Sequence, residues 1–146
     1  MTAEGVGAFV GTWRLVSLEA RLEDGEVIRA RRRRSGYLMY GGDGYMSVAF
    51  MADGRPRFSS SYIRGGTPEE KVTAINDYVS YCGRFEVKED RVVHHIEVSL
   101  FPNWVGTSQE RSYEFDGDRL TLSTPLMTVG GRRLSNRLVW EKVSCS

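Results

Sequence analysis

The sequence predicts an all-β protein, a closed up-and-down antiparallel β-barrel of eight to ten strands with one mid-chain α-helix. Glycine accounts for 16 of the 146 residues, above the usual share of about 7%. Asp-Gly pairs begin at Asp24, Asp43, Asp53 and Asp116, and each is typical of a hairpin turn because both residues tolerate positive φ. A long meander leaves two unpaired edges, and closure into a barrel removes them.

Nine runs between these turns have the composition of strands. They are expected at residues 12–22, 26–30, 36–40, 45–51, 82–87, 92–100, 107–115, 119–124 and 134–142. Two further turns are expected at Lys88–Arg91 and at Gly130-Gly131. A barrel of about eight strands has room for its own side chains or for one small ligand. A two-sheet sandwich is the alternative architecture.

One segment breaks the strand pattern. Thr67-Pro68-Glu69-Glu70 has the form of a capping box with proline at the first helical position. Val72, Ile75 and Val79 follow at helical spacing. The pattern predicts a helix from Thr67 to about Tyr81, and its apolar stripe should cover an open end or a gap in the sheet.

Composition narrows the class of protein. Hydrophobic residues make up 40% and charged residues 27% of the chain, and the net charge is +1, which is typical of a globular domain with no general attraction to nucleic acid or anionic lipid. The chain has no apolar run long enough to span a membrane and no signal-peptide pattern at its start. We therefore expect one domain over residues 1–146, cytoplasmic, without a membrane or nucleic-acid partner. A homodimer remains possible.

Two features are weak evidence for other functions. The run Arg31–Arg34 is expected to be a solvated loop, because arginine is abundant and lysine rare throughout the chain. An interaction module that uses this loop is the less favoured alternative. Cys82 and Cys145 lack the spacing of a zinc site and are too few for a disulfide scaffold. We expect no metal and no cofactor.

Alternation in the run 107–115 divides its side chains into two faces. The polar set should face water and consists of Glu110, Ser112 and Glu114. The interior set consists of Gln109, Arg111, Tyr113 and Phe115. This pattern places an arginine among aromatic rings inside the barrel, where a guanidinium needs a partner. That partner is a ligand carboxylate or enolate, or an inward acid such as Glu19; the alternative is a position of Arg111 at the rim.

In the run 92–100, alternation groups His94 with Val92, Ile96, Val98 and Leu100 on the more apolar face. His94 should therefore point inward and His95 outward, so the two histidines do not form a metal pair. His94 is either a core histidine with satisfied hydrogen bonds or a functional group.

These faces together predict an aromatic and aliphatic chamber with a few polar groups, which is the usual form of a small-molecule pocket. In the run 36–40 alternation does not decide between Tyr37 with Met39 and Leu38 with Tyr40. The candidate ligand-binding residues are Trp13, Tyr37, Met39, Tyr81, Phe85, His94, Trp104, Gln109, Arg111, Tyr113, Phe115, Asn136, Leu138 and Trp140.

Gly11-Thr12-Trp13 resembles the Gly-x-Trp motif that opens the first strand of lipocalins, and residues 9–142 resemble the bacterial lipocalin-like domain family. The further segments that carry the likeness are Gly36–Tyr40, Asp43–Ser47, Gly65–Glu70, Tyr81–Val87, His94–Glu97, Phe101–Thr107 and Arg119–Leu122. The resemblance implies a barrel with an internal cavity and with Trp13 across its closed end. The helix departs from secreted lipocalins, because it lies mid-chain and not after the last strand.

Two functions follow as hypotheses. In the first, the barrel binds a small hydrophobic molecule, anionic or phenolic, with Arg111 and His94 as anchors and Trp104 as a lid. In the second, it is a cofactor-free isomerase or cyclase acting on a metabolite such as a polyketide. His94 would then be the general base, since an unperturbed histidine titrates at about 6.5. Arg111 would stabilise an enolate-like charge.

Overall fold

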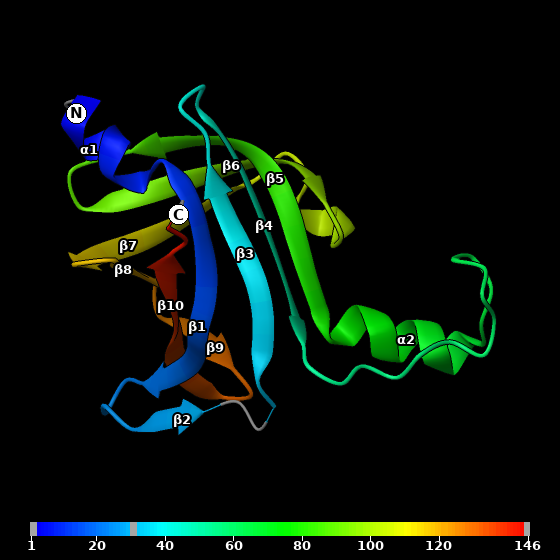
Figure 1. Cartoon of the computed structure of the whole chain (residues 1–146). Helices are drawn as coiled ribbons and strands as arrows, with labels where there is room; N and C mark the ends of the chain where they lie inside the picture. Colours follow the sequence, from blue (N-terminus) through cyan, green and yellow to red (C-terminus); the bar gives the residue numbers. More distant parts are fainter. Residues whose placement is uncertain (1–2, 30–31, 145–146) are drawn as a thin grey trace.

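A computed structural model describes residues 3–29 and 32–144, and a ten-stranded antiparallel sheet is its main element (Figure 1). The strands are β1 (Gly11–Leu22), β2 (Val27–Arg29), β3 (Arg34–Tyr40), β4 (Tyr45–Ala52), β5 (Tyr78–Val87), β6 (Arg91–Ser99), β7 (Ser108–Asp116), β8 (Arg119–Ser123), β9 (Met127–Val129) and β10 (Arg132–Lys142). The helices are α1 (Ala3–Phe9), α2 (Pro68–Asn76) and the 3₁₀ turn η1 (Pro102–Trp104).

The sheet closes into a barrel. Its strand order is β2-β1-β3-β4-β5-β6-β7-β8-β10-β9, and pairing of β1 with β10 joins the two sides. β2 and β9 lie outside the closed ring, at the end opposite α1 (Figure 1). The predicted up-and-down barrel is therefore confirmed, and the sandwich alternative is wrong.

Most predicted turns join strands as expected. Gly25, Gly44 and Gly117 have φ values of 97°, 90° and 58°, which is the region that favours glycine over other residues. The Asp53-Gly54 pair is the exception, because it ends β4 and begins the long connection to α2 instead of a hairpin. The sequence patterns also missed α1, η1 and the short strand β9.

The mid-chain helix is shorter than predicted. Its capping box is present, with Thr67 as N-cap, but α2 ends at Asn76 and not near Tyr81. Residues 78–81 instead pair with residues 48–51 of β4, because that strand's backbone groups need partners for the barrel to close. The expectation that Val72 and Ile75 cover the sheet is wrong. Both are exposed, and α2 extends away from the barrel (Figure 1).

A β-bulge changes the face of the final residues of β6. Cys82 pairs with Val98, whereas the next residue, Gly83, pairs with Ile96, so Glu97 is the extra residue. The bulge reverses the alternation beyond Ile96, and Val98 is therefore 64% exposed, contrary to the sequence prediction. Glycine is required opposite the bulge, since a Cβ on Gly83 would overlap the carbonyl oxygen of His95.

The end of the barrel next to α1 is filled by aromatic side chains. Phe9 of α1 is fully buried and makes edge-to-face contacts with the rings of Tyr40, Tyr113 and Phe115, at centroid distances of 5.4, 5.0 and 4.9 Å. Such pairs contribute beyond their buried area. We call this end the aromatic plug.

Trp13 closes the same end, as the resemblance implied. Its side chain is 2% exposed and its indole nitrogen donates a hydrogen bond to the carbonyl oxygen of Phe9 at 2.9 Å. The ammonium group of Lys142 lies 4.7 Å from the Trp13 ring centroid and donates to the carbonyl oxygen of Val10 at 2.7 Å. These bonds attach α1 and its phenylalanine to the first and last strands of the barrel.

The substitution Phe9→Ala should therefore destabilise the whole barrel, although Phe9 lies in a short helix outside the sheet. The expected loss is about 3–5 kcal/mol of unfolding free energy, as for other buried phenylalanines. Urea unfolding followed by tryptophan fluorescence measures it. Phe101→Ala is the matched control, because Phe101 is 46% exposed. Equal effects of the two substitutions would show that the aromatic plug does not stabilise the fold.

Candidate ligand-binding site

A cavity of about 420 Å³ occupies the half of the barrel away from the aromatic plug. The inward residues of each strand divide between the two halves. On β7, Phe115 and Tyr113 pack against Phe9, whereas Arg111 and Gln109 line the cavity. On β8, Leu120 belongs to the hydrophobic core whereas Leu122 also lines the cavity, and the wall of the cavity is mainly apolar.

Of the predicted ligand-binding residues, the larger part lies in the cavity wall. Those residues are Tyr81, His94, Trp104, Gln109, Arg111, Asn136, Leu138 and Trp140. They come from β5, β6, β7 and β10 and from η1. Alternation predicted the inward direction of the strand residues, whereas Trp104 lies on η1, outside any strand.

Four other predicted residues face the interior but do not line the cavity. Trp13, Phe85, Tyr113 and Phe115 belong to the hydrophobic cluster around the aromatic plug. The hydroxyl of Tyr113 donates to the carbonyl oxygen of Glu89 at 3.0 Å. Their assignment to the ligand-binding set is therefore corrected. Alternation shows which side chains of a strand face the interior, but it does not show how far along the barrel the interior is filled by side chains.

Tyr37 and Met39 lie on the outer surface, with exposed fractions of 47% and 48%. The register decides this, because Leu38 pairs directly with Trp13 and directly paired residues share a face. Trp13 points inward, so Leu38 does too, and Tyr37 packs outside under the guanidinium of Arg14. Their assignment to the ligand-binding set is corrected.

The sequence patterns also missed part of the wall. The missed residues include Arg34, Val48, Phe50 and Val79, and the wall also includes Leu38, whose direction alternation left undecided. Once Leu38 is placed inside, alternation along the same strand places Arg34 inside as well. Val79 was missed because it was assigned to the helix.

His94 lies in the cavity wall and is held by two tyrosines. Its Nε2 atom is 2.6 Å from the hydroxyl oxygen of Tyr40 and its Nδ1 atom is 2.7 Å from that of Tyr81. Burial, with smaller contributions from Arg111 and His95, lowers the pKa of His94 to about 3. The ring is therefore neutral at physiological pH, so one nitrogen donates to a tyrosine oxygen and the other accepts from the second hydroxyl.

The two tyrosine hydroxyls remain protonated. Burial raises the pKa of Tyr40 well above its usual value, with a further contribution from Tyr81, and burial also raises the pKa of Tyr81. Arg111 acts in the opposite direction on both groups. With both its nitrogens engaged and its pKa lowered, His94 has the environment of a satisfied core histidine. This geometry does not favour His94 as the general base of a reaction near neutral pH.

Arg111 lines the cavity without an acidic partner. Its Nη1 atom donates to the backbone carbonyl of Glu110 at 2.8 Å and to the side-chain oxygen of Gln109 at 3.5 Å. Glu19, the acid suggested as its partner, instead lies 3.6 Å from Arg21. Within residues 3–29 and 32–144, no ion pair involves Arg111 and no aspartate or glutamate lines the cavity. The interior is thus positively charged.

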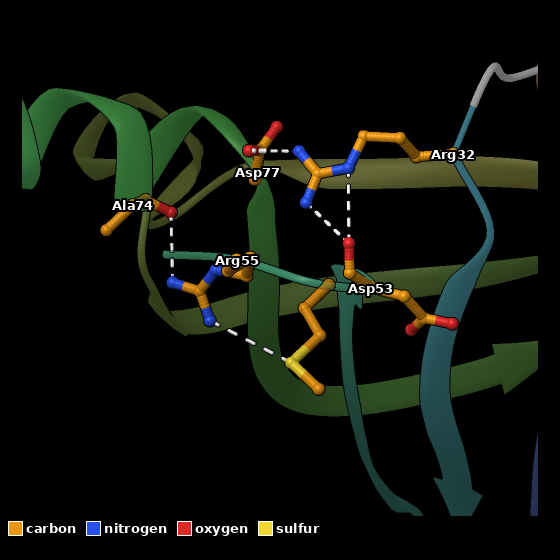
Figure 2. A network of polar contacts seen from close by, with 6 residues as sticks. Arg32, Asp53, Arg55, Ala74 and Asp77 are labelled. Carbon is orange, nitrogen blue, oxygen red and sulfur yellow. Dashed lines mark hydrogen bonds and ion pairs between the residues drawn. The ribbon is translucent and has the colours of Figure 1, made fainter. Parts of the chain in front are cut away.

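A polar network holds the connection between β4 and α2 against the barrel mouth (Figure 2). Arg32 forms an ion pair of 2.9 Å with Asp77 and donates to the backbone carbonyl of Asp53. Arg55 donates to the carbonyl oxygen of Ala74 at 3.1 Å. Arg32 is exposed, as expected for a solvated arginine loop, but it also has a structural contact; Arg31 lies outside the described residues.

Trp104 separates the cavity from a neighbouring groove. It lines both the cavity and this groove of about 400 Å³, together with Asn76 and Val79. Its ring packs edge-on against Tyr81 at 5.9 Å and against Phe101 at 5.3 Å. The lid role expected of Trp104 remains a prediction, and its place between the two spaces is consistent with it.

Membrane-spanning helices and metal-binding clusters are both absent from residues 3–29 and 32–144. No helix in this part is long and apolar enough to cross a bilayer, and no group of three or more His, Cys, Asp or Glu side chains could hold a metal ion. Cys82 is a free thiol, and Cys145 lies outside the described residues.

Comparison with known proteins gives two matches. A family model described as a lipocalin-like domain matches residues 10–143. The 4′-hydroxy-3′-methoxypropiophenone carrier protein ppsC of Aspergillus oryzae is 38% identical over 108 residues, which cover 67% of this chain and 96% of the relative. This relative is fungal, whereas the sequence patterns suggested a bacterial family. Phe9 and the rest of α1 precede the matched region.

The buried His94 should make stability depend on pH. In the unfolded chain histidine titrates at about 6.5, whereas the folded pKa is about 3. Between these values the unfolded chain binds a proton that the folded protein does not, so stability falls as the pH falls. From about pH 7.5 to about pH 5 the loss should be about 2 kcal/mol. Urea unfolding of the wild type and of His94→Gln measures it; an equal pH dependence in both would contradict this account.

Proposed function

Because the chain belongs to the lipocalin-like domain family, we propose that it is a binding protein that carries a small hydrophobic molecule with a phenolic or anionic group in its barrel cavity. The observation that supports this most strongly is the cavity itself. Its volume of about 420 Å³ lies in the range of pockets for small ligands. An apolar wall with few polar anchors suits an aromatic or aliphatic molecule that has one polar end.

Arg111 is the main hydrogen-bond donor of the cavity wall, because both nitrogens of His94 are engaged by tyrosines. Arg111 has a positive charge without an acidic partner, and it lines the cavity together with Tyr81 and His94. Arg111 is half-buried. A ligand that enters the cavity would remove its guanidinium further from water, which is costly unless the charge is paired, and an acceptor group of the ligand would supply the partner. This is the physical basis for an anionic or phenolic ligand.

The relative supports the same class of ligand. It is named as a carrier of 4′-hydroxy-3′-methoxypropiophenone, an aromatic ketone with a phenol group. We infer carriage and not conversion of the ligand, because both nitrogens of His94 are engaged by tyrosines.

Cavity filling tests this proposal. Leu138→Trp places an indole in the cavity and should weaken binding of 4′-hydroxy-3′-methoxypropiophenone by at least about tenfold, which corresponds to about 1.4 kcal/mol. Isothermal titration calorimetry measures the dissociation constant. Val139→Trp is the matched control, because Val139 follows Leu138 on β10 and alternation points it outward. If both variants bind like the wild type, the ligand does not occupy the cavity.

A further inference from the structure

We infer that the cavity binds its phenolic ligand as the phenolate, with the charged oxygen at Arg111 and a second acceptor of the ligand at Arg34. This inference rests on the proposed function and specifies the ligand class as para-acylphenols, which have an acidic hydroxyl at one end and a carbonyl at the other. It stands on the arrangement of two guanidinium groups in one cavity, whose wall has no aspartate or glutamate among the described residues.

The two arginines lie on opposite walls. In the closed ring β1-β3-β4-β5-β6-β7-β8-β10, β3 and β7 are separated by the same number of strands in both directions. Arg34 is on β3 and Arg111 on β7, and both line the cavity. They also differ in depth. On β7, one inward-facing residue, Tyr113, separates Arg111 from Phe115 of the aromatic plug. Arg34 is the first residue of β3, at the end of the barrel opposite the aromatic plug.

Neither guanidinium is neutralised by the protein. The acceptors of Arg111 are a backbone carbonyl and an amide oxygen, both uncharged and both bound by Nη1. Arg34 has no ion pair or side-chain hydrogen bond among the described residues, and its Nε is buried without a partner. The free N–H groups of each fork can therefore bind a ligand oxygen.

The deeper guanidinium is the better site for the charge. A charge pair is stronger where water is excluded, and Arg111 lies beside the buried Tyr81–His94 pair. The positive charge of Arg111 acts on these neighbours, since it lowers the pKa of His94 and opposes the rise in the pKa of Tyr81. The same field would lower the pKa of a bound phenol. Arg34, nearer the mouth, would donate to the neutral carbonyl.

The test uses 4′-hydroxy-3′-methoxypropiophenone and its 4′-O-methyl ether, which cannot ionise. Phenolates absorb at longer wavelength than phenols, so the ionisation midpoint of the bound phenol is measured by absorbance across a pH titration. It should lie at least about one pH unit below the midpoint of the free compound, which means that the anion binds about tenfold more tightly than the neutral form. Above the midpoint of the free compound, where the phenol is ionised both free and bound, the methyl ether should bind at least about tenfold more weakly than the phenol.

Substitutions test which arginine binds the phenolate end of the ligand and which binds its carbonyl end. Arg111→Gln should abolish the shift in midpoint, whereas Arg111→Lys should retain a shift. Arg34→Gln should weaken both compounds by a similar factor of about five, because it removes one hydrogen bond to the carbonyl. Arg84→Gln is the matched control, since Arg84 is 65% exposed on β5. Circular dichroism verifies that each variant is folded.

The outcomes separate the two proposals. The phenolate inference would be overturned if the bound phenol ionised at the same pH as the free compound, or if the shift persisted in folded Arg111→Gln. Either result would still allow the protein to carry neutral molecules. Failure of both compounds to bind the wild type would overturn this inference and count against the proposed function. If Arg111→Gln does not fold, the wild-type midpoint and the methyl ether still decide between charged and neutral binding.

Discussion

The hydrogen bonds of His94 to Tyr40 and Tyr81 connect the two halves of this barrel. Tyr40 packs against Phe9 in the aromatic plug, and Tyr81 packs against Trp104 at the mouth. The imidazole can make both bonds as a neutral ring, with one nitrogen donating and the other accepting. Burial enforces that state by lowering the pKa of His94. A protonated ring would leave a buried charge and a donor without an acceptor. These hydrogen bonds therefore link the aromatic plug to the cavity wall, and they make the stability of the fold depend on pH.

The functional character of the cavity follows from this division. Aromatic rings fill the end near α1, and the cavity lies in the other half. The polar groups that reach this space are donors or neutral amides, and the two guanidinium groups are the charges in its described wall. Under the proposed function, a hydrophobic pocket with unpaired positive charge would select against cations and favour flat molecules with an acidic oxygen. The absence of carboxylates from the described part of the wall would then contribute to specificity as much as the arginines do.

The sequence was sufficient for the barrel but not for the depth of its cavity. Asp-Gly turns and two-residue alternation are local signals, so they predicted the hairpins and the inward placement of Arg111 and His94. The inward face of β3 depends on its register with Trp13, and the reversal at Val98 depends on a bulge opposite Gly83; both are relations between strands. The helical spacing at Tyr78 and Val79 was overridden because β4 needs a partner strand. Phe9 gave no signal, since its burial arises only when the barrel is closed.

Native mass spectrometry of freshly purified protein tests the central claim most directly. The account predicts one small molecule for each chain, released unaltered after denaturation and carrying an acidic oxygen on an aromatic or other apolar frame. Loss of that adduct in Leu138→Trp, with retention in Val139→Trp, would locate it in the cavity. A cationic adduct, or one that persists in folded Leu138→Trp, would contradict the account. So would a bare protein that stays bare after incubation with 4′-hydroxy-3′-methoxypropiophenone.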